Sequence, residues 1–366
     1  MIELQNDRRR PYGMLEIVDG RAALYEAIEA TTGGGVRSSD ACTVMLSGNG
    51  PTGALAASLC EGLHGIMRGG LLHMQACGMY VRDCEALAER VIACNAGLLV
   101  AIGGGRIIDT AKSICARADV RLVVIPTALS SDGLCSPISV LTQPGGGKVR
   151  ESGAVPIAVV IDTEITRRAP LLFAVSGMCD LLSNASAQLD LADGHRHGAK
   201  RIDGVAAALA TAAYRAVCGL RPVDLCAHEG QRLLAQALYL SGRAMHVAGS
   251  STPCSGAEHT ISHAIDGLLA TSLPHGLQVG VCTLYCHHLR LRAGYTPLPP
   301  EVYRSLLGLG EFLSQAILEV KDRFVEAVLS SRGTRPDRTG ILDLVNEPGA
   351  FASAFDDTVA DLIKSD

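Results

Sequence analysis

The segment LLVAIGGGRIIDTAKSICA, residues 98–116, joins a strand-like run to a helix-like run through three glycines. Leu98–Ile102 is apolar throughout and has the length of a buried strand. Gly103–Gly105 ends this run, and apolar residues then recur with helical spacing over 108–116. Strands that are apolar on both sides are typical of a parallel sheet covered by helices on both faces, so this segment predicts an α/β domain.

The neighbouring segments continue the alternation of strand and helix. Apolar runs of strand length, separated by turn residues and helical spacing, extend from residue 41 to residue 161. We expect strands at 41–46, 70–74, 121–125 and 155–161, helices at 54–67 and 84–95, and a hairpin of 138–141 with 148–150 around the loop 145–147.

The second half of the chain has a different pattern, because β-branched runs become rare from about residue 165 and helical spacing dominates. We expect helices at 181–191, 205–217, 229–247, 257–268, 278–291 and 317–329. The predicted fold is an α/β N-terminal domain with a parallel sheet, residues 1–164, followed by an all-α C-terminal domain, residues 165–366.

Composition excludes several classes of protein. The chain has 366 residues, a net charge of −5 and no basic patch with interleaved aromatic residues, so we expect no nucleic-acid partner. No apolar run reaches the ~18 residues that a membrane span needs. The first ten residues lack the apolar stretch of a secretory signal, which predicts a cytoplasmic protein. Thirteen cysteines without a C-x-x-C motif indicate buried thiols in a reducing compartment.

The glycine turn is a candidate site for a cofactor. Glycines let the backbone approach a ligand closely, and the unpaired N–H groups of a helix N-terminus favour phosphate. The pattern is not the G-x-G-x-x-G fingerprint, and a tight turn without a ligand is the alternative. Asp109 is a further candidate for cofactor binding, or it is a first-turn carboxylate that complements the helix dipole.

A polar loop follows the next predicted strand. Residues 126–137, PTALSSDGLCSP, carry small hydroxyl side chains and one carboxylate, Asp132. Open α/β sheets bind ligands at the carboxyl ends of their strands, so this loop is a candidate binding segment. The alternative is a bare polar loop in which Asp132 and Gly133 form a simple turn.

Three histidines and one aspartate suggest a metal site. His259 and His263 are four residues apart and share one helix face, and His275 follows sixteen residues after His259, in a turn. Two of these imidazoles with a carboxylate would form a three-ligand site with an open position. Asp180 is the candidate carboxylate, or it is the N-cap of the helix that it precedes. Ordinary surface histidines are the other interpretation.

In this order, these segments resemble the glycerol-1-phosphate dehydrogenase branch of the iron-containing alcohol dehydrogenase and dehydroquinate synthase superfamily. The resemblance covers residues 35–342 and implies the dehydroquinate synthase-like two-domain fold. In that fold, the α/β domain (1–164) would bind the dinucleotide and the all-helical domain (165–366) would bind metal and substrate. The matching pieces are GGGRIIDTAK (103–112), PTALSSDGLCSP (126–137), GMCDLLSNASAQLD (177–190), SGAEHTISHAIDG (255–267), HGLQVG (275–280) and RPDRTGIL (335–342).

The resemblance also implies a role for each matching residue. The glycine turn would cradle the pyrophosphate of a nicotinamide cofactor, Asp132 would contact the substrate, and His263 would face the substrate as a proton relay. The implied cofactor-binding residues are Gly103, Gly104, Gly105, Thr127, Ser130 and Ser136, and the implied metal ligands are Asp180, His259 and His275.

The implied function is a metal-dependent, NAD(P)-linked dehydrogenase that interconverts an alcohol and its carbonyl, with reduction of dihydroxyacetone phosphate as the best match. The cofactors would be NAD or NADP and Zn²⁺, with Fe²⁺ as the alternative metal. A small-molecule substrate, a phosphorylated polyol or ketone, and a homo-oligomer are expected. Three alternatives are a reductase of another small carbonyl compound, a dehydroquinate-synthase-like cyclase and a non-catalytic cofactor-binding protein. Leu277 stands where the family usually has Glu, which is the main departure next to the HG pair.

Overall fold

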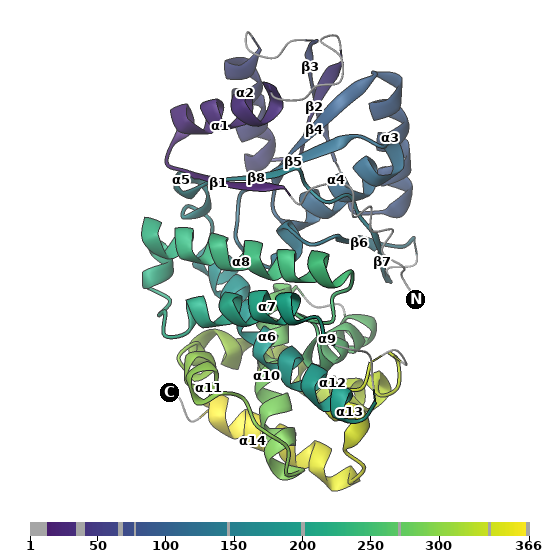
Figure 1. The fold of residues 1–366 in the computed structure, drawn as a ribbon, viewed down its shortest axis with the longest axis vertical. Coiled ribbons are helices and arrows are strands. Elements are labelled where there is room, and N and C mark those ends of the chain that lie inside the picture. Colours follow the sequence, from purple (N-terminus) through teal and green to yellow (C-terminus); the bar gives the residue numbers. More distant parts are fainter. Residues whose placement is uncertain are drawn as a thin grey trace. The chain divides into compact units, whose positions relative to one another are not determined.

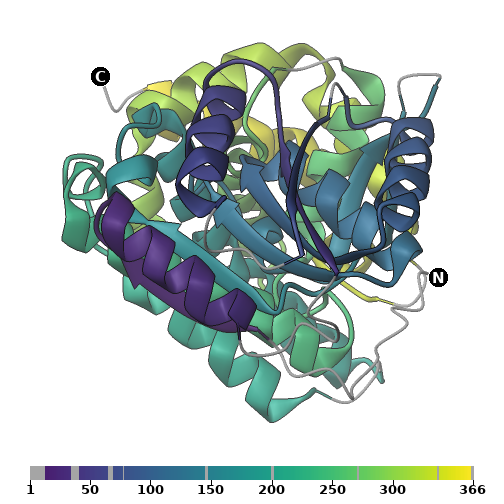
Figure 2. The same cartoon turned by 90° about the horizontal axis from the view of Figure 1, so that it is seen from above.

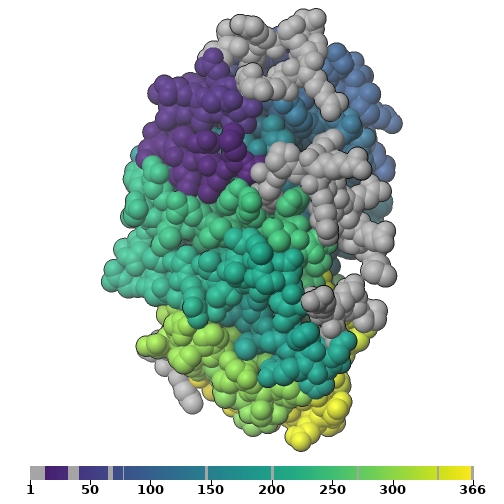
Figure 3. Space-filling view, in the orientation of Figure 1, coloured from purple at the N-terminus to yellow at the C-terminus, as the bar shows by residue number. Residues whose placement is uncertain are grey.

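The computed structural model describes two compact units of the chain. The described residues, coloured in Figure 3, are 13–33, 41–64, 69–76, 78–144, 147–198, 202–269, 272–335 and 338–363. Within these ranges the first unit comprises Met1–Leu129 with Gly133–Ala169, and the second comprises Ser130–Asp132 with Pro170–Asp366. The predicted boundary at residue 164 lies in the short helix α5, Thr163–Thr166.

The first unit is built on a six-stranded sheet in which every pairing is parallel (Figure 1). The strand order is β1–β8–β5–β4–β2–β3. This confirms the predicted α/β fold class with a parallel sheet. The strands are β1 Met14–Val18, β2 Cys42–Ser47, β3 Leu71–Gln75, β4 Ala96–Gly103, β5 Arg121–Pro126 and β8 Ala158–Asp162. The predicted hairpin is present as β6 Ile138–Thr142 and β7 Lys148–Ser152.

Helices cover the sheet because its central strands are apolar on both sides. Alternate residues of β4, such as Val100 and Ile102, pack in one core with Leu24 and Ile28 of α1 and with α2. Helix α1 lies along β1 and β8 (Figure 2). Helices α3 and α4 pack against each other and against β4. The helices are α1 Arg21–Gly33, α2 Pro51–Leu63, α3 Val81–Ala93 and α4 Gly105–Ala118.

The strand order reverses between β2 and β4. The chain passes from β2 to β3 on one side and returns to β4 on the other, so the connections after these adjacent strands run in opposite directions. Ligands of open α/β sheets bind at such a switch point, beyond the carboxyl ends of the strands. The turns after the two strands, residues 48–50 and 103–105, therefore mark the edge at which we expect a nucleotide.

Several boundaries in this unit differ from the sequence predictions. The strand predicted at 155–161 begins at Ala158. The helix predicted at 54–67 begins at Pro51, whose fixed φ suits a first helical position, and Met67 lies outside the described residues. No element was predicted before residue 41, yet β1 and α1 occupy that region. Strand β1 is a half-exposed edge strand of five residues, so it lacks the continuous apolar run of the others.

The second unit is helical, as predicted. Helices α6 and α10 are buried along most of their length, and the other helices pack around them. None of the described helices is both long and apolar enough to cross a membrane. The helices are α6 Leu171–Arg196, α7 Gly204–Val217, α8 His228–Ala248, α9 Ala257–Leu268, α10 His275–Arg292, α11 Pro300–Leu307, α12 Gly310–Ser331, α13 Ile341–Leu344 and α14 Pro348–Ile363.

Two sequence interpretations in this unit were wrong. Asp180 is not an N-cap, because α6 begins at Leu171 and Asp180 lies in its interior. Only 181–191 was predicted as helix here because α6 is buried on all sides and shows no amphipathic stripe. His275 is not in a loop but is the first residue of α10, which begins three residues before the predicted helix.

The buried side chain of His287, in α10, should make the stability of the protein sensitive to acid. Its ring stacks on Tyr303 with a centroid distance of 4.2 Å, and Nδ1 accepts a hydrogen bond of 3.3 Å from the Leu298 amide. Burial lowers the pKa of His287 from its ordinary 6.5 to about 4. The unfolded state therefore binds more protons between these values, and stability present above pH 6.5 is lost as the pH falls toward 4, by about 3 kcal/mol.

The measurement is the free energy of unfolding at pH 7 and at pH 4.5 for the wild type and for His287→Gln. The glutamine amide oxygen can accept the Leu298 hydrogen bond but does not titrate. We expect the wild type to lose more stability than the variant on acidification. Parallel pH profiles would show that His287 is not the acid-sensitive group.

Candidate metal centre and nucleotide turn

Three of the predicted metal-binding residues converge in the helical unit. Asp180 from α6, His259 from α9 and His275 from α10 each offer one ligand atom, and these atoms all lie within 4.8 Å of one another. The Oδ1 atom of Asp180 lies 3.4 Å from Nε2 of His259, and the ring centroids of His259 and His275 are 5.3 Å apart. This cluster comprises the same three residues that the sequence resemblance implies as ligands.

The cluster fits a divalent cation on chemical grounds. Asp180 is 2% exposed, and its Oδ1 atom is buried without a hydrogen-bond partner in the structure. A buried carboxylate oxygen without a partner is costly, and coordination to a cation would satisfy it. Two imidazole nitrogens and one carboxylate oxygen are a donor set that suits Zn²⁺ and Fe²⁺.

The surroundings of His259 favour positive charge at this point. Burial acts to lower the pKa of His259, but the carboxylates of Asp180 and Glu258 outweigh it and raise the pKa to about 9. Burial acts to raise the pKa of Asp180, yet the close approach and positive charge of His259 hold it below its ordinary value. Ionised carboxylates on both sides of one imidazole create a negative environment that a metal ion can neutralise.

The two proposed catalytic residues lie beside this cluster. The ring of His263 stacks on that of His275 with a centroid distance of 5.8 Å, and it is not one of the three clustered ligands. The backbone N–H of Asp132 donates to Oδ2 of Asp180 at 2.9 Å, and the Asp132 carboxylate accepts a 2.7 Å hydrogen bond from Ser241. The structure thus brings Asp132 into contact with Asp180 and His263 into contact with His275.

A close approach between α6 and α10 holds His275 in place. The Gly276 N–H donates to the Ser176 hydroxyl at 3.1 Å, and that hydroxyl donates to the Ser130 carbonyl at 2.9 Å. A Cβ atom at Gly276 would lie 1.9 Å from the Ser176 carbonyl oxygen. Gly276 therefore serves helix packing and not the turn that the sequence suggests.

The predicted glycine turn lies between β4 and α4. Gly103 packs against the following helix, since a Cβ there would approach Ile107 to 2.7 Å. A Cβ at Gly104 or Gly105 would meet nothing within 4 Å, so the backbone is open at the start of a helix of 14 residues. The Thr127 amide donates to the Gly103 carbonyl and places Thr127 beside the turn. An open cradle at a helix N-terminus fits the pyrophosphate of a dinucleotide.

Two other predicted cofactor residues surround the buried Lys112. Its ammonium group forms an ion pair with Asp109 at 2.8 Å and donates to the carbonyls of Gly133 at 2.7 Å and Ser136 at 3.4 Å. The first turn of α4 contains no acidic residue, so Asp109 lies beyond it. Burial raises the pKa of Asp109 above its ordinary value. Lys112 therefore ties the 133–138 loop to α4, a role that the sequence analysis did not assign.

Sequence reasoning also missed residues that hold the candidate ligand His259 and its neighbours in the site. Glu258, fully buried, contacts His259, while Ser176 and Ser241 hold Gly276 and Asp132. The only sequence signal for Glu258 was its position, as an acidic residue directly before His259 on an apolar helix. Small hydroxyl residues in apolar helices carry no such signal, because they also occur there as ordinary packing residues.

Comparison with known proteins agrees with these observations. Residues 43–170 match the iron-containing alcohol dehydrogenase family. Glycerol-1-phosphate dehydrogenase [NAD(P)+] of Methanosarcina barkeri is 33% identical over 276 residues, which are 75% of this chain and 76% of that relative. The enzyme of the same name from Haloquadratum walsbyi is 34% identical over 274 residues, 74% of this chain and 77% of the relative.

Solved structures of related fold agree with the architecture of this chain. The crystal structure of glycerol dehydrogenase from Schizosaccharomyces pombe superposes with a TM-score of 0.72 at 18% identity, over 100% of this chain and 93% of that one. At this identity the likeness concerns the fold alone. The sequence relatives confirm the resemblance that the motifs indicate. The chain therefore belongs to the iron-containing alcohol dehydrogenase family, in the branch of the NAD(P)-linked glycerol-1-phosphate dehydrogenases.

Proposed function

We propose that this chain is a metal-dependent, NAD(P)-linked dehydrogenase that reduces dihydroxyacetone phosphate to sn-glycerol 1-phosphate and catalyses the reverse reaction. The observation that carries the proposal is the cluster of Asp180, His259 and His275, in which a buried carboxylate oxygen lacks a partner. The names and activities of the sequence relatives support the substrate. Zn²⁺ is the proposed ion, with Fe²⁺ as the alternative, since the donor set suits both.

Asp180, His259 and His275 would hold the divalent ion, and Gly103–Gly105 with Thr127, Ser130, Ser136 and Asp109 would bind the cofactor. A bound ion acts as a Lewis acid toward the substrate oxygen, and the nicotinamide carries the hydride. Asp132 orients the substrate, because Ser241 and the link to Asp180 fix its carboxylate and backbone. His263 moves the proton to or from the substrate oxygen, as an imidazole can near neutral pH.

A cofactor-coupled assay tests the proposed reaction. Purified protein with Zn²⁺ and NADH or NADPH is given dihydroxyacetone phosphate or unphosphorylated dihydroxyacetone, and oxidation of the nicotinamide is followed by absorbance. We expect turnover with the phosphorylated ketone and a product that sn-glycerol-3-phosphate dehydrogenase does not oxidise. A dehydroquinate-synthase-like cyclase would use the cofactor only transiently and would show no net absorbance change.

Other results would change the assignment. Turnover only with unphosphorylated or unrelated carbonyl compounds would identify a reductase with another substrate. If the protein bound metal and cofactor but turned over none of these carbonyl compounds, a non-catalytic binding protein would be favoured. The homo-oligomer and the cytoplasmic location remain predictions, and sedimentation analysis of the purified protein would determine the number of subunits.

A further inference from the structure

We propose that Glu258 is a positioning residue of the metal centre, which fixes the ring of His259 and strengthens Nε2 as a metal ligand. This inference rests on the proposed metal site. It concerns a residue that does not belong to the ligand set but contacts one of its members. It also assigns a purpose to Arg335 and Arg338, to which the proposed reaction gives no role.

Glu258 meets His259 on the side of the ring opposite to the ligand cluster. Its Oε1 atom lies 2.9 Å from Nδ1 of His259, while Nε2 of the same ring lies 3.4 Å from Asp180. Glu258 is fully buried, and His259 is 8% exposed. The carboxylate is thus withdrawn from water and directed at the one ring nitrogen that does not face the cluster.

This contact determines which ring nitrogen can bind a metal. A carboxylate at Nδ1 keeps the proton on that atom and leaves the lone pair on Nε2, which is the tautomer that coordination requires. The negative charge also raises the basicity of the imidazole and therefore its strength as a ligand. His259 would then be held in one orientation, so that its side chain loses little conformational entropy when an ion binds.

The start of α9 is in turn fixed, so that Glu258 itself has one position. Its Oε1 atom also accepts a 2.6 Å hydrogen bond from the Gly256 N–H. Asp190 accepts a 2.7 Å hydrogen bond from the next amide, Ala257, and a 3.0 Å hydrogen bond from Ile341. The buried Arg290 pairs with Asp190 and Asp193 and balances their charge.

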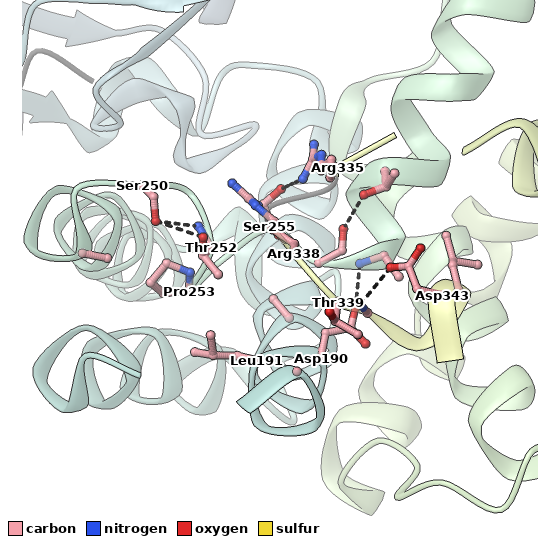
Figure 4. A pocket seen from close by; sticks show the side chains of 18 of the residues that line it. Asp190, Leu191, Ser250, Thr252, Pro253, Ser255, Arg335, Arg338, Thr339 and Asp343 are labelled. Atoms are coloured by element: carbon pink, nitrogen blue, oxygen red, sulfur yellow. Dashed lines mark hydrogen bonds between the residues drawn. The ribbon is translucent and has the colours of Figure 1, made fainter. Parts of the chain in front are cut away.

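Two arginines, Arg335 and Arg338, clamp the residues immediately before α9. Arg338 donates to the Ser255 carbonyl at 2.8 Å and to the Ser251 hydroxyl at 3.0 Å, and Arg335 donates to the Ser255 hydroxyl at 3.1 Å. Both arginines, Ser255 and Asp190 line a pocket of about 270 Å³. Figure 4 shows Arg335 and Arg338 beside Ser255, with a dashed line from Arg335 to the Ser255 hydroxyl. The clamp holds the backbone that presents Glu258 to His259.

A purely structural role is the competing explanation. Glu258 lies in the first turn of α9 and accepts from Gly256, so it could serve only as a helix cap with a favourable dipole interaction. A cap affects stability, whereas a positioning residue affects the affinity of the site for metal. The two roles therefore differ in a measurement that does not depend on catalytic activity.

The experiment measures the dissociation constants of Zn²⁺ and Co²⁺, by chelator competition, for the wild type, Glu258→Gln and Glu258→Ala. The Co²⁺ forms also give a visible spectrum that reports the ligand geometry. We expect affinity to fall by about 10- to 100-fold in Glu258→Gln, which keeps the size and an acceptor but loses the charge, and further in Glu258→Ala. The Co²⁺ spectrum should change in both variants.

Asp361→Asn is the matched control, because it removes another carboxylate of this unit that contacts a histidine, at 2.8 Å from Nε2 of His288, which is outside the ligand set. We expect it to lower the melting temperature while leaving both the affinity and the spectrum close to those of the wild type. Glu258 variants that lose stability but bind metal like the wild type would overturn the positioning role and leave the proposed function intact. A wild type that binds no divalent ion would overturn both.

Discussion

Replacing Gly276 by alanine should deprive the protein of bound metal and of turnover. The new Cβ would lie 1.9 Å from the Ser176 carbonyl oxygen and 2.8 Å from its hydroxyl, closer than atoms can approach. Because both elements are helix backbone, α10 must move away from α6, and His275, the first residue of α10, must move with it. We expect a loss of about 1–3 kcal/mol in stability, as for an overpacked core, together with a large loss of metal affinity.

Gly280→Ala is the control for this prediction, since it makes the same change one turn later in α10. A Cβ there would meet side-chain atoms of Cys179 and Leu313 at 3.0 Å, which can yield slightly. We expect its metal content to equal that of the wild type. Metal content is measured by elemental analysis of the purified proteins, and full metal content in Gly276→Ala would show that the close approach does not position His275.

Histidine substitutions should separate metal binding from proton transfer. His259→Ala removes a proposed ligand and should abolish both bound metal and turnover. His263→Ala removes the proposed proton relay and should lower kcat by about 10²- to 10⁴-fold while metal stays bound, because His263 is outside the three-residue cluster. Elemental analysis and steady-state kinetics of the same preparations give both quantities.

His195→Ala serves as the control for these variants, because His195 is exposed in the last turn of α6. It should retain both metal and activity. If His263→Ala lost its metal and His259→Ala kept it, the two histidines would have exchanged roles. If both kept metal and activity, neither role would stand.

The sequence predicted the fold well where the physical signal is local. The apolar run 98–102 and its glycines mark β4 and the start of α4 because both faces of a parallel strand are buried. The four-residue spacing of His259 and His263 likewise predicted a shared helix face, and α9 presents both rings toward His275. Asp180 lies far away in the chain, so spacing could not join it to them. It was a candidate because it stands alone in an otherwise apolar helix, and the family resemblance supported it.

Features that depend on tertiary contacts could not be read from the sequence. Gly276 resembles a turn glycine, and only the approach of α6 shows why no side chain fits. Lys112 resembles a solvent-facing helix residue, although the 133–138 loop buries it completely. The edge strand β1 lacks an apolar run because β8 is its only partner strand in the described sheet.

A crystal structure of the metal-loaded protein with anomalous scattering data tests the three-ligand site most directly. We expect one divalent ion at about 2.0–2.2 Å from a carboxylate oxygen of Asp180 and from nitrogens of His259 and His275, with an open coordination position. His263 should lie near the ion without coordinating it. An ion bound elsewhere in the chain, or one that His263 coordinates in place of His259 or His275, would contradict the proposed site.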